Sequence, residues 1–254
     1  MSKNPSTSNV FQPAINNQLE PNIKAALINH LRLNGIISLG TPILNEFSIF
    51  EGARRADLCI IVKSRMIAFE IKSEADSLTR LEGQIEDYLS YFDKVVVVTA
   101  PKFTAQIKKM VPKKIGIWEI DNNSITQKQR GSLSLIRDRS NLISALRKKD
   151  LEALKKKSNS ISLELVNELK IRKFVLNNIS SRYQPYFEYF WHLVENRNVT
   201  MHDLKYLSPY IETRKIMTQR RQDLETSWKK IQSPDFIKEI HATVIKLKKE
   251  LVTL

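Results

Sequence analysis

Hydrophobic and polar positions form clear blocks in the middle of the first half of the chain. Two short apolar runs, ADLCIIV (56–62) and MIAFEIK (66–72), are separated by a polar turn and predict a β-hairpin. Apolar residues then recur at helical spacing over 78–92, and VVVV (95–98) indicates a strand buried on both faces. The pattern therefore predicts the order strand, strand, helix, strand.

The flanking segments extend this pattern into an α/β domain. A helix opening at Pro21 and ending before Gly35 comes first, and 43–50 follows as a strand. After the central elements, the pattern predicts a helix near 104–110, a strand over 115–120, and a turn at 121–123 with a further strand behind it. The fold class expected for this half is α/β, a mixed sheet with helices on its faces.

Beyond residue 140 the pattern becomes entirely helical, with Lys and Arg on the polar faces, over 140–157, 161–177, 182–196, 201–221 and 235–251. Residues 1–18 are rich in Asn, Ser, Gln and Pro and are expected to form a flexible arm. The predicted organisation is therefore an arm at 1–18, an α/β domain at 19–130 and a basic helical domain at 131–254.

The charge is strongly positive and unevenly distributed. The formal net charge is +14 and the sequence pI is about 9.8. Residues 1–120 hold 15 Lys and Arg against 12 Asp and Glu, a net charge of +3, so the remaining +11 lies in the later half. Such an excess favours a polyanionic partner such as nucleic acid or an anionic membrane surface. The candidate phosphate contacts are Arg54, Arg55, Lys155, Lys156, Lys157, Arg220 and Arg221, although solvated helix faces would look the same.

Other classes of site have little support in the sequence. Cys59 is the single cysteine and lies in an apolar run, so neither a disulfide framework nor a cysteine-based zinc site is expected. The four histidines have no ligand spacing. The N-terminus lacks the apolar stretch of a signal peptide and no run approaches a membrane span, so a cytoplasmic location is expected.

Charged residues inside the apolar strands are the candidate chemistry. The hairpin places Asp57, at the start of one strand, beside Glu70, near the end of the other, and Lys72 shares a face with Glu70. Two carboxylates in an apolar sheet suit Mg²⁺ or Mn²⁺, whose bound water becomes a nucleophile. Ordinary strand-end charges facing water are the plainer alternative.

This arrangement resembles the PD-(D/E)XK nuclease superfamily over about residues 20–120. Asp57, Glu70 and Lys72 match its acidic, acidic and lysine positions, with Ala56 in place of the nominal proline. Gln84 and Tyr88 match the QxxxY pattern of its RecB-like and resolvase-like branches, and the pieces together look like a little-studied bacterial and phage subgroup. The resemblance implies a restriction-endonuclease-like fold, metal ligation by Asp57, Glu70 and the Ile71 carbonyl, and an additional acidic ligand for which Glu46 is a candidate. It also implies that the catalytic residues are Asp57, Glu70, Lys72, Gln84 and Tyr88.

The function expected from this resemblance is a Mg²⁺-dependent deoxyribonuclease that hydrolyses phosphodiester bonds, with the basic helices holding the nucleic acid. Two alternatives stay open: a non-catalytic nucleic-acid-binding protein, and a nuclease subunit active only with a partner protein. DNA is the expected partner, and homodimer formation or protein binding through the helical region is also open. The sequence does not choose between endonuclease and exonuclease action, or between DNA and RNA.

Overall fold

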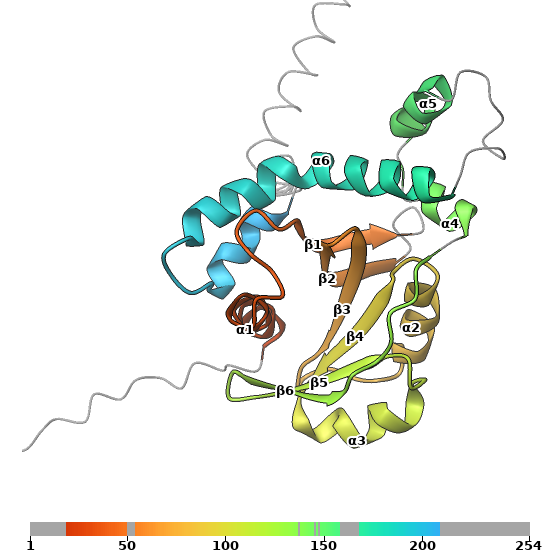
Figure 1. Cartoon of the computed structure of the whole chain (residues 1–254). Helices are drawn as coiled ribbons and strands as arrows, with labels where there is room; N and C mark the ends of the chain where they lie inside the picture. Colours follow the sequence, from red (N-terminus) through yellow and green to blue (C-terminus); the bar gives the residue numbers. More distant parts are fainter. Residues whose placement is uncertain are drawn as a thin grey trace, which may run out of the picture. The chain divides into compact units, whose positions relative to one another are not determined.

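A six-stranded mixed sheet lies at the centre of the structure, which is a computed structural model (Figure 1). The residues it describes are 19–49, 54–136, 138–144, 146, 148–157 and 168–208. The predicted arm at 1–18, the predicted helix at 235–251, and Arg220 and Arg221 lie outside these residues.

The strands are adjacent in the order in which the chain makes them. They are β1 (Ile43–Ile49), β2 (Arg54–Val62), β3 (Arg65–Lys72), β4 (Lys94–Thr99), β5 (Gly116–Asp121) and β6 (Ser124–Gln129). The first three strands and the last pair are antiparallel, whereas β3, β4 and β5 run parallel. The predicted α/β class with a mixed sheet is thereby confirmed.

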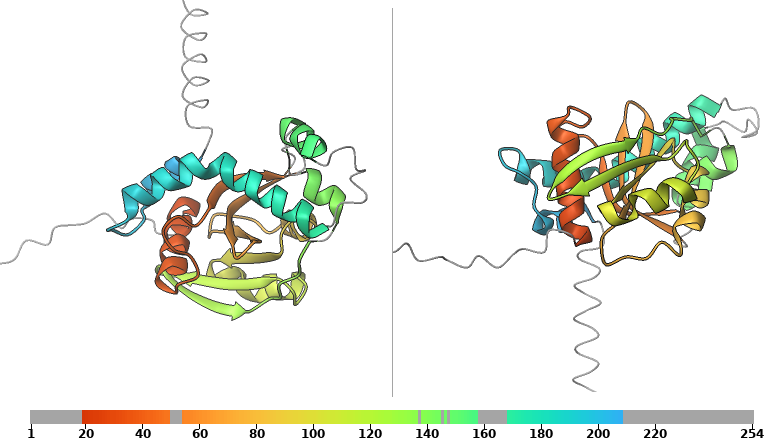
Figure 2. Two further views of the ribbon diagram at one scale, coloured as in Figure 1. Left: turned by 45° about the horizontal axis from the view of Figure 1, so that its top comes forward. Right: turned by 90° about the horizontal axis from the view of Figure 1, so that it is seen from below.

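Helices cover both faces of the sheet. They are α1 (Glu20–Leu33), α2 (Leu81–Leu89) and α3 (Pro101–Met110). Right-handed crossovers from β3 to β4 and from β4 to β5 place α2 and α3 on one face, and α1 lies against the other (Figure 2). The parallel strands therefore end between α1 on one side and the two crossover helices on the other.

The later helices continue the same compact unit through Ser208. They are α4 (Arg139–Ser144), α5 (Lys148–Lys157), α6 (Glu168–Val194) and the 3₁₀ helix η3 (Met201–Leu207). The indole N–H of Trp191 on α6 donates to the Thr41 carbonyl at 2.8 Å, and the rings of Phe47 and Tyr183 meet edge to face with centroids 5.9 Å apart. The described residues from Leu19 to Ser208 belong to one compact unit. The division expected at residue 130 stays a prediction.

Two predicted helical segments differ from those in the structure. The expected helices at 161–177 and 182–196 meet in the single helix α6, which continues through Pro185. Pro185 cannot donate to the carbonyl of Ser181, but both residues are exposed, so water can satisfy that oxygen. Within the predicted helix at 201–221, residues 201–207 form η3, opened by a capping box between Thr200 and Asp203.

Tight turns explain why the two hairpins close where they do. Lys63 and Ser64 link β2 to β3 with φ of 49° and 59°, and Asn122 and Asn123 link β5 to β6 with φ of 45° and 67°. Two consecutive positive φ angles are typical of type I′ turns, whose twist matches that of paired strands. None of the helices in the described part of the chain is long and apolar enough to cross a bilayer.

Candidate functional site

Four of the predicted catalytic side chains are joined by a continuous series of hydrogen bonds. The Lys72 ammonium donates to Oε1 of Glu70 at 2.8 Å and to Oε1 of Gln84 at 3.1 Å. The Tyr88 hydroxyl lies 2.9 Å from Oε2 of Glu70 and 2.7 Å from the Arg55 carbonyl oxygen, and shares one proton between them. Burial, and then the charge of Glu70, raise the pKa of Tyr88, so the phenol stays protonated at neutral pH.

The geometry of strand and helix explains why these side chains meet. Glu70 and Lys72 are two residues apart on β3 and share a face of the sheet. Gln84 and Tyr88 are four residues apart on α2 and therefore lie one helical turn from each other. Glu70 is only 2% exposed, so both of its oxygens find their partners inside the protein. The network ties α2 to β3.

Asp57 stands beside this network. The register of β2 and β3 pairs Leu58 with Phe69, so Asp57 is level with Glu70. Oδ2 of Asp57 accepts the N–H of Ile71 at 2.7 Å. Burial, and then the charge of Glu70, hold the pKa of Asp57 well above its usual range, outweighing the opposite effects of Lys24 and the Ile71 N–H.

Asp57 also belongs to a carboxylate cluster with Glu46 and with Glu20, a residue that the motif did not include. One carboxylate oxygen from each of Glu20, Glu46 and Asp57 lies within 4.8 Å of the others. The ammonium of Lys24, which is nearly fully buried, lies 2.7 Å from Oε1 of Glu20 and also donates to Glu46. Burial disfavours the charge of Lys24, but Glu46, Asp57 and Glu20 outweigh this effect and raise the pKa of Lys24. Carboxylates and ammonium thus stabilise one another.

Glu46 has an unusual backbone conformation for a strand residue. Its φ is 57°, although it lies between the regular pairs Asn45–Leu58 and Phe47–Ala56. A non-glycine residue in this region costs on the order of 1–3 kcal/mol and is often found at functional sites. Among the predicted site residues, Glu46 is therefore the one whose backbone conformation gives independent support for a functional role.

The predicted phosphate contacts have mixed outcomes. Nε of Arg54 lies 2.5 Å from Oδ2 of Asp87, and Nε of Arg55 lies 3.4 Å from Oε2 of Glu46, so both arginines already have carboxylate partners. Lys156 is exposed on α5. The side chains of Lys155 and Lys157, and all of Arg220 and Arg221, lie outside the described residues. The role of these residues in binding nucleic acid stays a prediction.

A group of basic residues that the sequence analysis did not single out gathers where β3, β4 and β5 begin. We call it the basic end and define it as Lys63, Arg65, Lys94, Lys113, Lys114 and Arg130. Ile67 pairs with Lys94, and the pairing of Val96 with Gly116 places Lys94 level with Lys114. Burial, and then the charge of Arg130, lower the pKa of Lys94. Lys94 is half-buried, and the other five side chains are exposed.

A buried ion pair supports the basic end from beneath. The carboxylate of Asp93 accepts the N–H groups of Met66 at 2.8 Å and Ile136 at 2.9 Å, and also bonds the guanidinium of Arg172. Arg172 donates in addition to the Ser64 carbonyl at 3.0 Å. This pair joins the first turns of α6 to the β2–β3 turn and to the start of β4.

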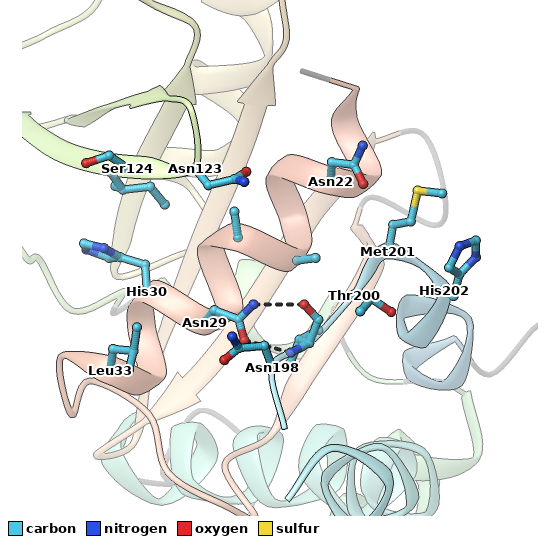
Figure 3. Close-up of a pocket in the computed structure, with 14 residues that line it drawn as sticks. Asn22, Asn29, His30, Leu33, Asn123, Ser124, Asn198, Thr200, Met201 and His202 are labelled. Carbon is cyan, nitrogen blue, oxygen red and sulfur yellow. Dashed lines mark hydrogen bonds between the residues drawn. The ribbon is translucent and has the colours of Figure 1, made fainter. Parts of the chain in front are cut away.

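A pocket of about 630 Å³ lies between α1, the β5–β6 turn and the segment that leads into η3 (Figure 3). Its lining contains no Asp, Glu, Lys or Arg, although such residues make up 27% of the chain. The polar lining residues are Asn22, Asn29, Asn123, Asn198, His30, His202, Ser124 and Thr200. The amide of Asn29 is held by Val199, whose carbonyl accepts a hydrogen bond at 2.9 Å and whose N–H donates one at 2.8 Å.

Comparison with known proteins gives a different family from the one that the motif suggested. Residues 14–208 match the family model described as bacteriophage P4 protein cII. The chain is 34% identical over 209 residues to protein cII of Enterobacteria phage P4, covering 74% of this chain and 77% of that protein. It is also similar to a protein of unknown function from Silicibacter pomeroyi, with 15% identity and a TM-score of 0.37 over 56% of this chain and 93% of the other.

These matches correct the interpretation drawn from Asp57, Glu70 and Lys72. Acidic, acidic and lysine positions at the end of a hairpin form a short motif, whereas the family model spans most of the chain. Assignment to the PD-(D/E)XK nuclease superfamily was therefore wrong, and so was the nuclease function inferred from it. The chain belongs to the bacteriophage P4 protein cII family.

Proposed function

We propose that this protein is a non-catalytic nucleic-acid-binding protein that contacts phosphate groups through the basic end. The observation that carries the proposal is the convergence of six Lys and Arg side chains from four separate segments onto the start of the parallel strands. In contrast to Arg54 and Arg55, none of these six forms an ion pair with a carboxylate of the described residues. Phosphate binding needs such cations close together, and it supplies most of the affinity for nucleic acid.

The network around Glu70 supports a structural role for the motif residues. The side chain of Lys72 is 9% exposed and is directed to Glu70 and Gln84, and both oxygens of Glu70 are engaged. A buried polar network in which every member is bonded adds rigidity and specifies how α2 packs on the sheet. We therefore assign these residues to holding α2 on the sheet at the carboxyl end of β3, away from the basic end.

Titration with DNA tests this function. The full chain is titrated with fluorescein-labelled duplex and single-stranded DNA in millimolar Mg²⁺, and the length of the DNA is checked after prolonged incubation. We expect binding that weakens as salt rises. For each tenfold rise in salt, log K should fall by about 0.9 per phosphate neutralised. The DNA should stay intact, and the Lys72→Ala variant should bind it with the same affinity as the wild type. Absence of binding at moderate salt would refute the proposal, as would cleavage that Lys72→Ala abolishes.

We also propose that the cluster of Glu20, Glu46 and Asp57 binds a divalent cation, Mg²⁺ or Mn²⁺. Carboxylate oxygens within 4.8 Å of one another are the ligands that such hard cations prefer. The ammonium of Lys24 contacts two of the three carboxylates, so this side chain has to change its rotamer when an ion binds. The bound cation would supply charge compensation for carboxylates that are held close together.

The raised pKa of Asp57 sets the expected pH dependence of this site. In the folded protein without metal, Asp57 keeps its proton to a higher pH than in the unfolded chain. The stability from this proton is complete below the ordinary pKa of about 3.9 and is lost as pH rises through the folded value. Asp57→Asn should therefore be more stable than wild type at neutral pH without metal.

Thermal unfolding with and without Mg²⁺ tests the cation site. A concentration ten times the Kd should stabilise the wild type by about 1.4 kcal/mol. This gain should grow with pH because the ion displaces the Asp57 proton. Asp57→Asn should lose the gain, whereas Asp121→Asn, at an exposed aspartate outside the cluster, should keep it. An equal response in both variants would exclude the site.

A further inference from the structure

We infer that the uncharged pocket between α1 and the β5–β6 turn binds a single neutral nucleobase. The choice of a nucleobase over other neutral rings rests on the proposed nucleic-acid binding. The pocket lies at the carboxyl end of β5, whereas the basic end lies where the same strand begins. The two sites therefore divide the recognition of base and phosphate between opposite ends of the sheet.

The lining excludes most charged ligands. In a chain with a net charge of +14, a phosphate or carboxylate site would be expected to include Lys or Arg, and the pocket includes neither. Burial lowers the pKa of His30, so its imidazole is neutral at pH 7. The lining therefore favours a ligand that is recognised by hydrogen bonds and apolar contact.

Asparagine amides suit the edge of a base. An amide presents a donor and an acceptor side by side, and this pattern matches the paired donor and acceptor on a nucleobase edge. Asn29 is already bonded to Val199 and forms a fixed wall, whereas Asn123 brings an amide to the pocket from the β5–β6 turn (Figure 3). Its φ of 67° belongs to the type I′ turn, so the backbone fixes where its side chain begins.

Apolar groups at the same pocket suit the faces of a base. Leu33 is 83% exposed and Met201 is 38% exposed, and both line the pocket. Exposed apolar side chains next to amides provide contact for a flat ring as well as hydrogen bonds for its edge. The volume of about 630 Å³ lies within the range of small-molecule sites and accommodates a nucleoside.

The turn itself provides a matched pair of variants. Asn123→Gly removes the amide from the pocket and Asn122→Gly removes its neighbour, which does not line it. Both positions have positive φ, so glycine is tolerated at each without backbone strain. Ala26→Phe, from the helix wall, would fill the pocket and serves as the blocking variant.

Isothermal titration calorimetry tests the inference. The full chain is titrated with each of the four deoxynucleosides, with a five-nucleotide single strand and with a 20-base-pair duplex. At least one deoxynucleoside or the single strand should bind to the wild type. Asn123→Gly should weaken that binding about five- to tenfold, the effect of one lost hydrogen bond. Asn122→Gly should leave it within twofold and Ala26→Phe should abolish it. Binding of nucleosides would identify a free base as ligand, and binding of the single strand alone would identify an unpaired base.

Several outcomes separate this inference from the proposed function. If neither nucleosides nor single strand respond to Asn123→Gly while duplex DNA still binds, the pocket inference is overturned and the nucleic-acid function stands. If nucleosides bind in the expected variant pattern but no DNA binds, the pocket stands and the proposed function fails. Should Ala26→Phe not fold, the comparison of the two glycine variants still decides.

Discussion

Replacing Arg172 with methionine is expected to lower the free energy of unfolding by about 3–5 kcal/mol, the usual cost of leaving a buried charge without its partner. Asp93 is fully buried, and its other partners are the backbone N–H groups of Met66 and Ile136. The change also removes the bond from Arg172 to the Ser64 carbonyl. Urea denaturation followed by circular dichroism measures the loss.

Lys173→Met is the matched control, since it removes a neighbouring, exposed cation from the same helix. It should change stability by less than about 0.5 kcal/mol. Asp93→Asn in the Arg172→Met background should recover part of the loss because it removes the unpaired charge. An Arg172→Met protein within 1 kcal/mol of wild type, roughly the size of an average substitution, would mean that the ion pair does not hold α6 to the sheet.

The double variant Lys114→Glu/Arg130→Glu is expected to weaken DNA binding about 10- to 100-fold near 0.1 M salt, since two phosphate contacts become repulsive. The Ser132 N–H donates to the Lys114 carbonyl, which keeps the two segments side by side and places both charges on one surface. The slope of log K against log salt should become shallower by about 1.8. Fluorescence anisotropy across a salt series measures both quantities.

Lys102→Glu/Lys205→Glu makes the same change in net charge at exposed positions outside the basic end. It should cost no more than about threefold in affinity, the general effect of a lower net charge. If the two double variants lose affinity equally, binding depends on overall charge, and the basic end has no special part in it.

Local periodicity was sufficient to predict the hairpin and which of its charged residues share a face, whereas Gln84 and Tyr88 were linked to them only by the resemblance. Alternation along β3 puts Glu70 and Lys72 on one face, and the four-residue spacing on α2 puts Gln84 and Tyr88 together. The structure brings all four into contact. The family was missed because a few correctly spaced residues are a less specific signal than a family model that matches most of the chain.

What the sequence analysis missed depends on contacts between distant segments. Glu20 and Lys24 show only an ordinary i, i+4 spacing, and nothing in it indicates that α1 docks beside Glu46 and Asp57. In the sequence, Arg172 is one of many cations in a basic helical segment. Only the packing of α6 over Asp93 shows that it forms a buried ion pair. The near-neutral count for residues 1–120 concealed the basic end because carboxylates elsewhere in the same half balance it.

The position of α6 along β1 also bears on self-association. β1 and β6 are the outer strands of the sheet, and outer strands can pair with another chain. Most of β6 (SITQKQ) is polar and exposed, which discourages such pairing, whereas β1 (ILNEFSI) is largely apolar and packs against α6. A fragment that ends before Glu168 would contain all six strands but would lack α6, and β1 would then be exposed. Its expected defect is therefore strand-to-strand aggregation of a folded sheet.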